Sequence, residues 1–160
     1  MAKPAKTQSA VSSTSAPYLG QHVRGLDHGR VILPSEWRLG GSAVDFMLVL
    51  WPLTSRDYLL VLPPSRWEVI RKHLEELSIT DDQVAVVERL IGVNSFSRSL
   101  DRYGRLPLPE DASRAVGIGK EAMLVGRMDK FEVWNPARFA ATLANPDAQR
   151  IADVIKTMRI

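Results

Sequence analysis

The sequence predicts an α+β fold made of two pseudo-symmetric, β-rich halves that share one core. The first observation is a repeated stretch: GRVILP at residues 29–34 returns 75 residues later as GRLPLP at residues 104–109, with four of six positions identical. The second is an echo of residues 59–67 in residues 131–139, at an offset of 72, with Val, Pro and Arg kept in place. Two echoes in the same order indicate one structural unit used twice. Two copies are too few for a solenoid and favour one compact domain.

The composition is that of an ordinary soluble globular protein. The 160 residues are 45% hydrophobic and 24% charged, and no apolar run is long enough to predict a membrane span. The absence of cysteine excludes disulfides and thiolate metal sites and is typical of a cytoplasmic chain. Two of the 21 Lys and Arg residues precede Tyr18, which leaves 19 bases against 18 acids. A polyanionic partner would therefore have to be recognised by clustered Arg residues and not by the total charge.

Four segments are expected along the chain. Residues 1–17 contain Ala, Ser, Thr, Lys and Pro with one Val, so they bury too little apolar surface to offset the entropy of ordering, and we expect disorder there. The first half is expected over residues 18–92 and the second over residues 93–144. Residues 145–160 are expected to hold a final helix.

The strands of the first half are expected as two hairpins. Residues 19–24 form a strand candidate, residues 25–29 contain turn formers, and residues 30–33 return before a proline. The continuous apolar run at residues 46–51 is a strand, and after a Pro- and Ser-containing turn residues 58–62 form its partner.

Helices of the first half follow from proline positions and apolar spacing. A short helix of one or two turns is expected at residues 35–38. Pro64 suits a helix N-terminus, because its missing N–H would be unpaired there, and helical spacing of apolar residues continues to about Leu77. Thr80 followed by two Asp residues predicts an N-cap. The next helix has an expected apolar face of Val84, Val87, Leu90 and Ile91.

The second half repeats this plan. Pro107 cannot donate a hydrogen bond to a strand ladder, so the strand that contains it is expected at a sheet edge. The final helix is amphipathic and could pack within the chain or against a partner. The expected elements are a strand at 95–99, a turn within 100–105, a strand at 106–108, a short helix at 110–116, a hairpin of 122–126 with 131–134, and helices at 136–143 and 148–158.

Catalysis finds little support in the residue pattern. The three His residues are scattered, and none has a carboxylate or a second His at metal-ligand spacing. Residues 117–120 resemble the end of a phosphate loop but lack its first Gly and the Ser or Thr after Lys, so a helix cap and turn is expected. We therefore expect no enzyme, no metal and no cofactor.

The two Asp-turn-Gly-Arg loops are the candidate binding site. Asp can bond backbone N–H groups inside a tight turn, and Gly tolerates positive φ, so Asp27, Gly29, Asp101 and Gly104 are expected to shape the loops. Arg30 and Arg105 would then be exposed at hairpin mouths, where a guanidinium suits a guanine edge or a phosphate. The alternative is a structural Asp–Arg pair that staples each turn.

Further basic residues lie in or near the same loops. Arg24, Arg98 and Arg102 are expected to contact phosphates or flanking groups of double-stranded DNA. His28, in the first turn, could do the same or could be a solvated turn residue.

The chain from Tyr18 to about Ala144 resembles the MraZ family of bacterial transcriptional regulators, which are built from two AbrB/SpoVT-like units. The segments that carry the resemblance are Tyr18-Leu19-Gly20, Leu26-Asp27-His28-Gly29-Arg30, Leu33-Pro34, the run from Leu62 to Trp67, the run from Leu100 to Pro109, and Phe131-Glu132-Val133-Trp134. The resemblance implies two swapped-hairpin β-barrel halves decorated with short helices, assembled into a ring. It also implies binding to short G-rich direct repeats upstream of the division and cell-wall gene cluster.

The family signature in each half is Asp, three residues, then Arg. Asp101 and Arg105 fit this spacing, whereas Asp27 precedes Arg30 by three residues, so the first loop is one residue shorter. His28 stands where a Lys is usual, and Tyr103 replaces a polar residue.

These observations together predict a sequence-specific DNA-binding transcriptional regulator that is cytoplasmic and nucleoid-associated. Arg30 and Arg105 would reach bases, a homo-oligomer would engage repeated boxes, and neither a membrane nor a small-molecule substrate is expected. The alternative is a ring-forming structural protein that has lost specific DNA readout, which the shorter first loop favours.

Overall fold

The computed structural model describes residues 17–40, 43–77, 82–144 and 146–159. The expectations for residues 1–16, Thr80 and Asp81 lie outside these ranges. The elements in chain order are β1 (Gln21–Asp27), β2 (Arg30–Ile32), η2 (Ser35–Trp37), β3 (Asp45–Trp51), β4 (Tyr58–Leu62), α1 (Pro64–Glu76), α2 (Asp82–Val93), β5 (Ser95–Ser99), β6 (Arg105–Pro107), α3 (Glu110–Ala115), β7 (Glu121–Gly126), β8 (Phe131–Trp134), α4 (Pro136–Leu143) and α5 (Ala148–Thr157).

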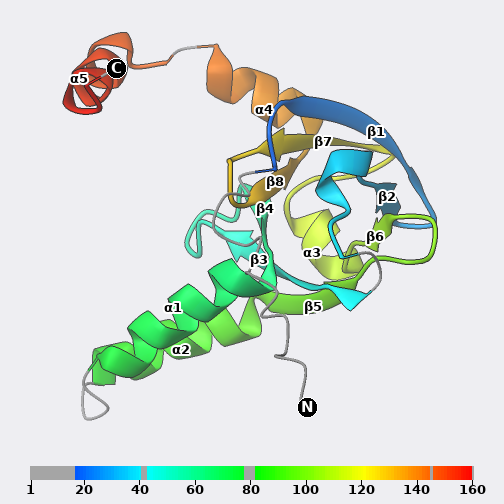
Figure 1. Ribbon diagram of the computed structural model, residues 1–160, viewed down its shortest axis with the longest axis horizontal. Helices are drawn as coiled ribbons and strands as arrows, with labels where there is room; N and C mark the ends of the chain where they lie inside the picture. The colour runs from blue at the N-terminus through cyan, green and yellow to red at the C-terminus, as the bar shows by residue number, and fades with distance from the viewer. Residues whose placement is uncertain (1–16, 41–42, 78–81, 145, 160) are drawn as a thin grey trace, which may run out of the picture.

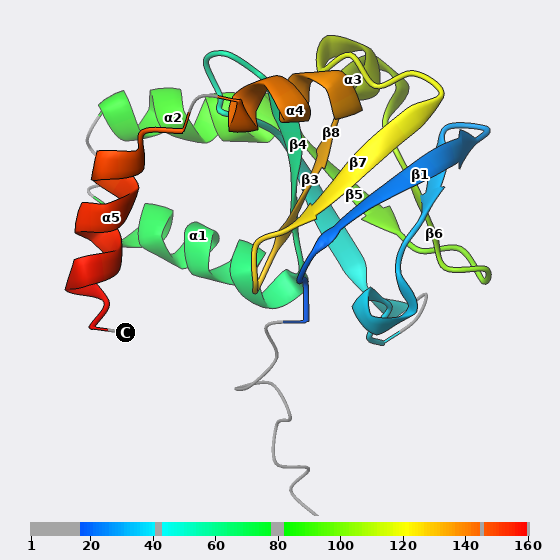
Figure 2. The ribbon, with the colours of Figure 1, turned by 90° about the horizontal axis from the view of Figure 1, so that it is seen from above.

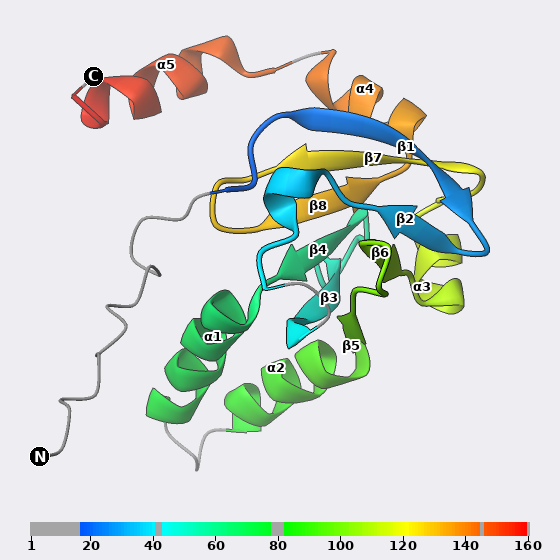
Figure 3. The ribbon, with the colours of Figure 1, turned by 45° about the vertical axis from the view of Figure 1, so that its right-hand side comes forward.

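All eight strands form one antiparallel sheet in the order β5-β3-β4-β8-β7-β1-β2-β6. Each strand of the first half pairs with a strand of the second, as β1 with β7, β2 with β6, β3 with β5 and β4 with β8. The two end strands, β5 and β6, lie in contact, so the sheet curls into a nearly closed barrel (Figure 1; Figure 3). If β1 to β4 are exchanged with β5 to β8, respectively, the order of strands around the barrel stays the same. The predicted α+β, pseudo-symmetric fold is therefore confirmed.

The core is built by both halves. Val31 of β2 and Leu106 of β6 occupy equivalent places in the repeat, and both are completely buried. Aromatic rings from distant parts of the chain meet at Phe131, whose centroid lies 4.9 Å from Trp37, 5.1 Å from Tyr18 and 5.8 Å from Phe46. Burial of large side chains from both halves in one cluster stabilises them as a single unit.

The helices lie outside the barrel. α1 packs against β3 and β4, where partly buried Trp67 and Ile70 join Val49, Leu60 and Leu62 in a second apolar cluster. In Figure 2, α1 and α2 extend from one end of the barrel, and α5 stands apart from it. Within the described ranges, no helix is long and apolar enough to cross a membrane.

The first hairpin differs from the expectation. Residues 25–29 were expected to form the turn, but β1 continues to Asp27, because Gly25 stays in the ladder opposite Glu121. The turn consists of His28 and Gly29 alone, with φ of 50° and 74°. Two positive φ values match a turn whose twist suits the flanking strands, which explains why so short a connection suffices.

Most other elements agree with the expectation. Pro64 and Pro136 begin α1 and α4, and β6, which contains Pro107, lies at an end of the sheet order. The expected apolar face of α2 is only half covered. Val84 and Ile91 are buried, whereas Val87 and Leu90 are 40% and 39% exposed.

Gly126 offers a test of the packing between the start of β1 and the end of β7. A Cβ on Gly126 would lie 2.4 Å from the carbonyl oxygen of Tyr18, and the backbone there must move to admit it. We expect Gly126→Ala to lower the free energy of unfolding by about 1–3 kcal/mol. The matched control is Gly92→Ala in α2, where nothing lies within 4 Å, and it should raise stability by about 0.5–1 kcal/mol. Chemical denaturation measures both, and equal effects would contradict the close approach.

Candidate nucleic-acid interface

The β1–β2 turn places one acid and one base on opposite strands. Asp27 and Arg30 are directly paired across the ladder, with His28 and Gly29 as the turn between them. The Asp27 carboxylate Oδ1 lies 2.7 Å from Nδ1 of His28, whose side chain is 83% exposed. The turn is thus polar and open to solvent on its outer side.

The equivalent loop in the second half is organised by Asp101. Its Oδ1 accepts hydrogen bonds from the backbone N–H groups of Tyr103 and Arg105, each at 2.9 Å. Gly104 has a φ of 79° and donates its N–H to the carbonyl oxygen of Asp101 at 3.0 Å. A carboxylate that accepts two backbone N–H groups favours the turn conformation from within the loop itself.

Pairing of β2 with β6 joins the two loops into one carboxylate–guanidinium cluster, made of Asp27, Arg30, Asp101 and Arg105. Arg105 donates from Nε to Oδ2 of Asp101 at 2.7 Å and from Nη1 to Oδ2 of Asp27 at 2.6 Å. Arg30 is held less closely, with Nη1 3.6 Å from Asp101 and Nη2 3.9 Å from Asp27. Each carboxylate therefore contacts both guanidinium groups.

The cluster lowers the pKa of both carboxyl groups. For Asp27, the hydrogen bond with His28 is the main cause, and the charges of Arg105 and Arg30 add to it. Desolvation raises the pKa of Asp101, but hydrogen bonds from Arg105 and Tyr103 together with the charge of Arg105 outweigh it, so that pKa is lowered. The hydrogen bond to Asp101 in turn raises the pKa of Arg105.

The arginines are less exposed than expected. The side chains of Arg30 and Arg105 are 33% and 20% exposed, because each lies against carboxylates from both loops. The structural Asp–Arg ion pair considered as an alternative is present. It closes the second loop through Asp101 and also joins the two halves through Asp27. Stapling and base contact are compatible, since a guanidinium has more donors than Asp101 and Asp27 occupy.

Tyr103, which was not among the expected binding residues, lies beside the cluster. Tyr103 is 56% exposed, and the guanidinium carbons of Arg102 and Arg105 lie 4.9 and 5.1 Å from its ring centroid. The aromatic ring therefore lies within cation–π distance of two guanidinium groups at the loop. Its position between two arginines in the sequence was the signal that could have drawn attention to it.

Two of the expected flanking residues lie further back on the strands. Arg24 donates to the carbonyl oxygen of Val23 at 3.1 Å, and Arg98 donates to that of Ser97 at 2.8 Å. In the described part of the chain, neither forms an ion pair with the cluster. The expected set is therefore divided into Asp27, His28, Gly29, Arg30, Asp101, Arg102, Gly104 and Arg105 at the loops, and Arg24 and Arg98 on β1 and β5.

Across the described residues, no group of three or more His, Cys, Asp or Glu side chains is arranged to hold a metal ion.

Comparison with known proteins identifies relatives over most of the chain. The family model described as "MraZ protein, putative antitoxin-like" matches residues 93–157. A transcriptional regulator MraZ of Shewanella amazonensis is 31% identical over 130 residues, which are 81% of this chain and 82% of that protein. The MraZ of Azotobacter vinelandii is 30% identical over 77% of this chain and 81% of its own length. The MraZ of Roseiflexus castenholzii is 26% identical over 82% of this chain and 90% of its own length.

The lowered carboxyl pKa values predict how stability depends on pH. Asp27 and Asp101 remain ionised in the folded protein at lower pH than in the unfolded chain. Their stabilising contribution is fully present above about pH 4, the ordinary carboxyl pKa, and is lost as the pH falls through the lowered values. Arg105→Ala should thus melt at a lower temperature than the native protein near neutral pH, and this gap should narrow below about pH 4.

Arg102→Ala is the matched control, because in the described structure Arg102 stacks on Tyr103 and forms no ion pair with the cluster. Its melting temperature should stay close to the native value at both pH extremes. Thermal unfolding followed by circular dichroism measures the gap, and a gap for Arg105→Ala that stays constant into acid would contradict the assignment.

Proposed function

The chain belongs to the MraZ family of transcriptional regulators, which is not a family of enzymes, and from this premise we propose that it binds double-stranded DNA sequence-specifically through the two loops that carry the carboxylate–guanidinium cluster. The observation that supports this most directly is the pairing of β2 with β6, which puts Arg30 and Arg105 on the same face of the ladder, where both contact Asp27 and Asp101. A planar guanidinium can donate two parallel hydrogen bonds to a guanine edge.

In this proposal the cluster contacts bases, and other basic residues attract the DNA phosphates. Its two carboxylates balance its two guanidinium groups, so it adds no net charge that would draw the protein to phosphates. Attraction is assigned to Arg24, Arg98 and Arg102, which flank the cluster or lie behind it on the strands, and His28 in the first turn is assigned a phosphate or flanking contact. The carboxylates orient Arg105 through two hydrogen bonds and hold Arg30 through two longer ion pairs, and an oriented guanidinium is what base discrimination requires.

The proposed targets are short G-rich boxes in direct repeat, upstream of the division and cell-wall gene cluster, which places the protein in the cytoplasm at the nucleoid. One subunit offers few base contacts, so several linked subunits must engage repeated boxes to reach useful affinity. The proposed assembly is a closed homo-oligomer, a ring.

The C-terminal helix supports such an assembly. Side chains along one side of α5 are 44–58% exposed, although they are apolar: Ile151, Val154, Ile155 and Met158. Figure 1 shows α5 beyond α4 and away from the barrel. An amphipathic helix that leaves its apolar side in solvent is a candidate contact between copies.

Substitution of the loop arginines tests DNA reading. Arg30→Ala and Arg105→Ala should each cost about 1–3 kcal/mol of binding free energy per engaged subunit and blur discrimination at one base position. Arg102→Ala should weaken binding to all sequences alike and reduce the salt dependence. Fluorescence anisotropy with a duplex from upstream of the gene, at a temperature where every variant is folded, measures both effects.

The outcomes separate the two candidate functions. If only Arg105→Ala loses specificity, the shorter first loop serves as a scaffold. If neither variant loses it while the oligomer persists, the loops do not read DNA, and a ring-forming structural protein is the better description.

Assembly is tested on α5. Ile155→Glu introduces a charge into the exposed apolar side, and we expect it to reduce the mass measured by light scattering from a multiple of 17.8 kDa towards 17.8 kDa. Lys156→Gln, a neighbouring change of similar size, should leave the mass unchanged. A native mass of one chain at micromolar concentration would refute the oligomer and the multivalent binding that depends on it.

A further inference from the structure

Arg38 is a cation beside the second loop that is not among the expected binding residues. It directly follows Trp37 of η2, which is 1% exposed and packs in the core against Tyr18 and Phe131. The backbone N–H of Arg38 donates to the carbonyl oxygen of Ser35 at 3.2 Å. The backbone of Arg38 is therefore anchored to the core, and its side chain extends from a fixed point.

The side chain of Arg38 lies on Gly104, the residue before Arg105. A Cβ on Gly104 would lie 2.3 Å from Cδ and 2.7 Å from Nη1 of Arg38, so the guanidinium occupies space that a side chain at position 104 would need. The backbone ties the same two segments together, because Leu33 donates its N–H to the carbonyl oxygen of Gly104 at 3.0 Å. The guanidinium of Arg38 thus flanks the loop that supplies Asp101 and Arg105 to the cluster.

No carboxylate of the described residues pairs with this cation. Nε of Arg38 is buried without a hydrogen-bond partner. The terminal nitrogens Nη1 and Nη2 form no hydrogen bond or ion pair with any residue that the structure describes, and the residue is partly exposed. An unpaired guanidinium that has lost part of its hydration is unfavourable, and its terminal nitrogens are available to bind an anion.

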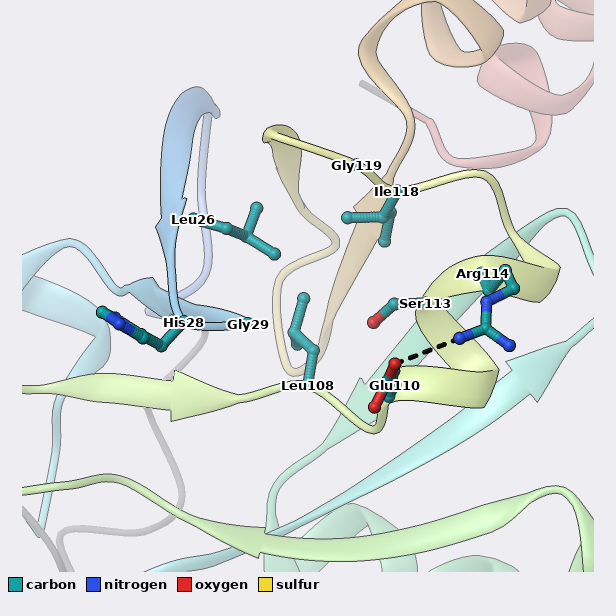
Figure 4. Close-up of a pocket in the computed structure, with 9 residues that line it drawn as sticks. All are labelled: Leu26, His28, Gly29, Leu108, Glu110, Ser113, Arg114, Ile118 and Gly119. Atoms are coloured by element: carbon teal, nitrogen blue, oxygen red, sulfur yellow. Dashed lines mark hydrogen bonds and ion pairs between the residues drawn. The ribbon is translucent and has the colours of Figure 1, made fainter.

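The corresponding place beside the first loop is different. Nothing lies within 4 Å of a Cβ on Gly29, which borders an open cavity of about 560 Å³ together with Ser113 and Arg114. Arg114 ends the polar run after the second Gly-Arg stretch, as Arg38 ends the run after the first. Figure 4 shows Arg114 turned to Glu110, to which it donates at 3.1 Å. Of these two arginines, Arg38 is the one that the described residues leave without a carboxylate.

We propose that Arg38 binds a backbone phosphate of double-stranded DNA through Nη1 and Nη2, beside the bases that the second loop contacts. A guanidinium can donate two parallel hydrogen bonds to one phosphate. The charges of the cluster balance, so a neighbouring unpaired cation supplies attraction that the cluster lacks. Because Arg38 is anchored to the core and packed on Gly104, a phosphate bound there sets the register of Arg105 on the duplex. This assignment rests on the proposed function.

The test compares Arg38→Gln with Arg38→Lys in the full-length protein, by fluorescence anisotropy with the upstream duplex and with an unrelated duplex of equal length. Arg38→Gln removes the charge. It should reduce the slope of log affinity against log salt concentration by about 0.9 per engaged subunit, and weaken binding to both duplexes about tenfold per engaged subunit at about 0.1 M salt. Arg38→Lys keeps the charge and should restore the slope.

Arg138→Gln is the matched control. The Arg138 side chain lies on Gly117 in a similar way, with Cζ 2.9 Å from the place of a Cβ, and Gly117 has a φ of 75° where Gly104 has 79°. Arg138 belongs to α4, which lies away from β6 in Figure 1 and Figure 2. The same loss of charge there should leave the slope and both affinities unchanged.

Duplexes that carry one neutral methylphosphonate locate the contact. At one phosphate in each bound box the native protein should lose about tenfold in affinity, and Arg38→Gln should lose nothing further, because the two changes remove the same interaction. A native slope for Arg38→Gln, or the lack of any such phosphate, would overturn the assignment.

The remaining outcomes separate this assignment from its alternatives. If Arg38→Lys binds as weakly as Arg38→Gln and both change the preference between the two duplexes, Arg38 braces the loop and binds no phosphate. Native protein that binds neither duplex would overturn this assignment together with the proposed function. An Arg105→Ala variant that keeps its sequence preference, in a protein where Arg38→Gln lowers the slope, would overturn base reading alone and support the phosphate contact.

Discussion

Strand pairing between the halves is the constraint on which the rest of the structure depends. Every strand from β1 to β4 pairs with a strand of the second half, so the sheet cannot close unless both halves are present. The pair β2–β6 lies on the pseudo-twofold axis of this arrangement, and it carries Arg30 and Arg105. The candidate site is therefore a product of the same pairing that builds the core, and it cannot be assembled by one repeat alone.

The carboxylate–guanidinium cluster explains why each loop carries Asp and Arg together. Asp101 is bonded by two backbone N–H groups and by the Arg105 side chain, so the same carboxylate shapes the loop and orients the guanidinium group. Among the described contacts, the Asp27 carboxylate accepts no backbone N–H. Its position is set by side-chain bonds with His28 and with Arg105 of the other half. Charges that are only partly shielded from solvent gain little free energy from pairing alone, so the cluster contributes more to the orientation of its side chains than to the stability of the fold.

Local patterns predicted most of the fold. The repeat, the hairpins and the helix starts at Pro64 and Pro136 depend on neighbouring residues, and the structure confirms them. The extension of β1 to Asp27 was missed, because Gly25 reads as a turn former unless its partner Glu121 is known. The bond from Arg105 to Asp27, 78 residues apart, and the cavity beside Ser113 were equally out of reach, since both arise only when the halves interleave.

The two halves have diverged in ways that give their loops different properties. A turn of two residues between Asp27 and Arg30 leaves Arg30 with ion pairs of 3.6 and 3.9 Å, whereas the longer second loop holds Arg105 at 2.6 and 2.7 Å. Arg38 further packs against the second loop at Gly104, while the first loop borders an open cavity at Gly29. The second loop is thus held by shorter ion pairs and closer packing than the first, and part of that hold comes from Asp27 and Arg38 of the first half.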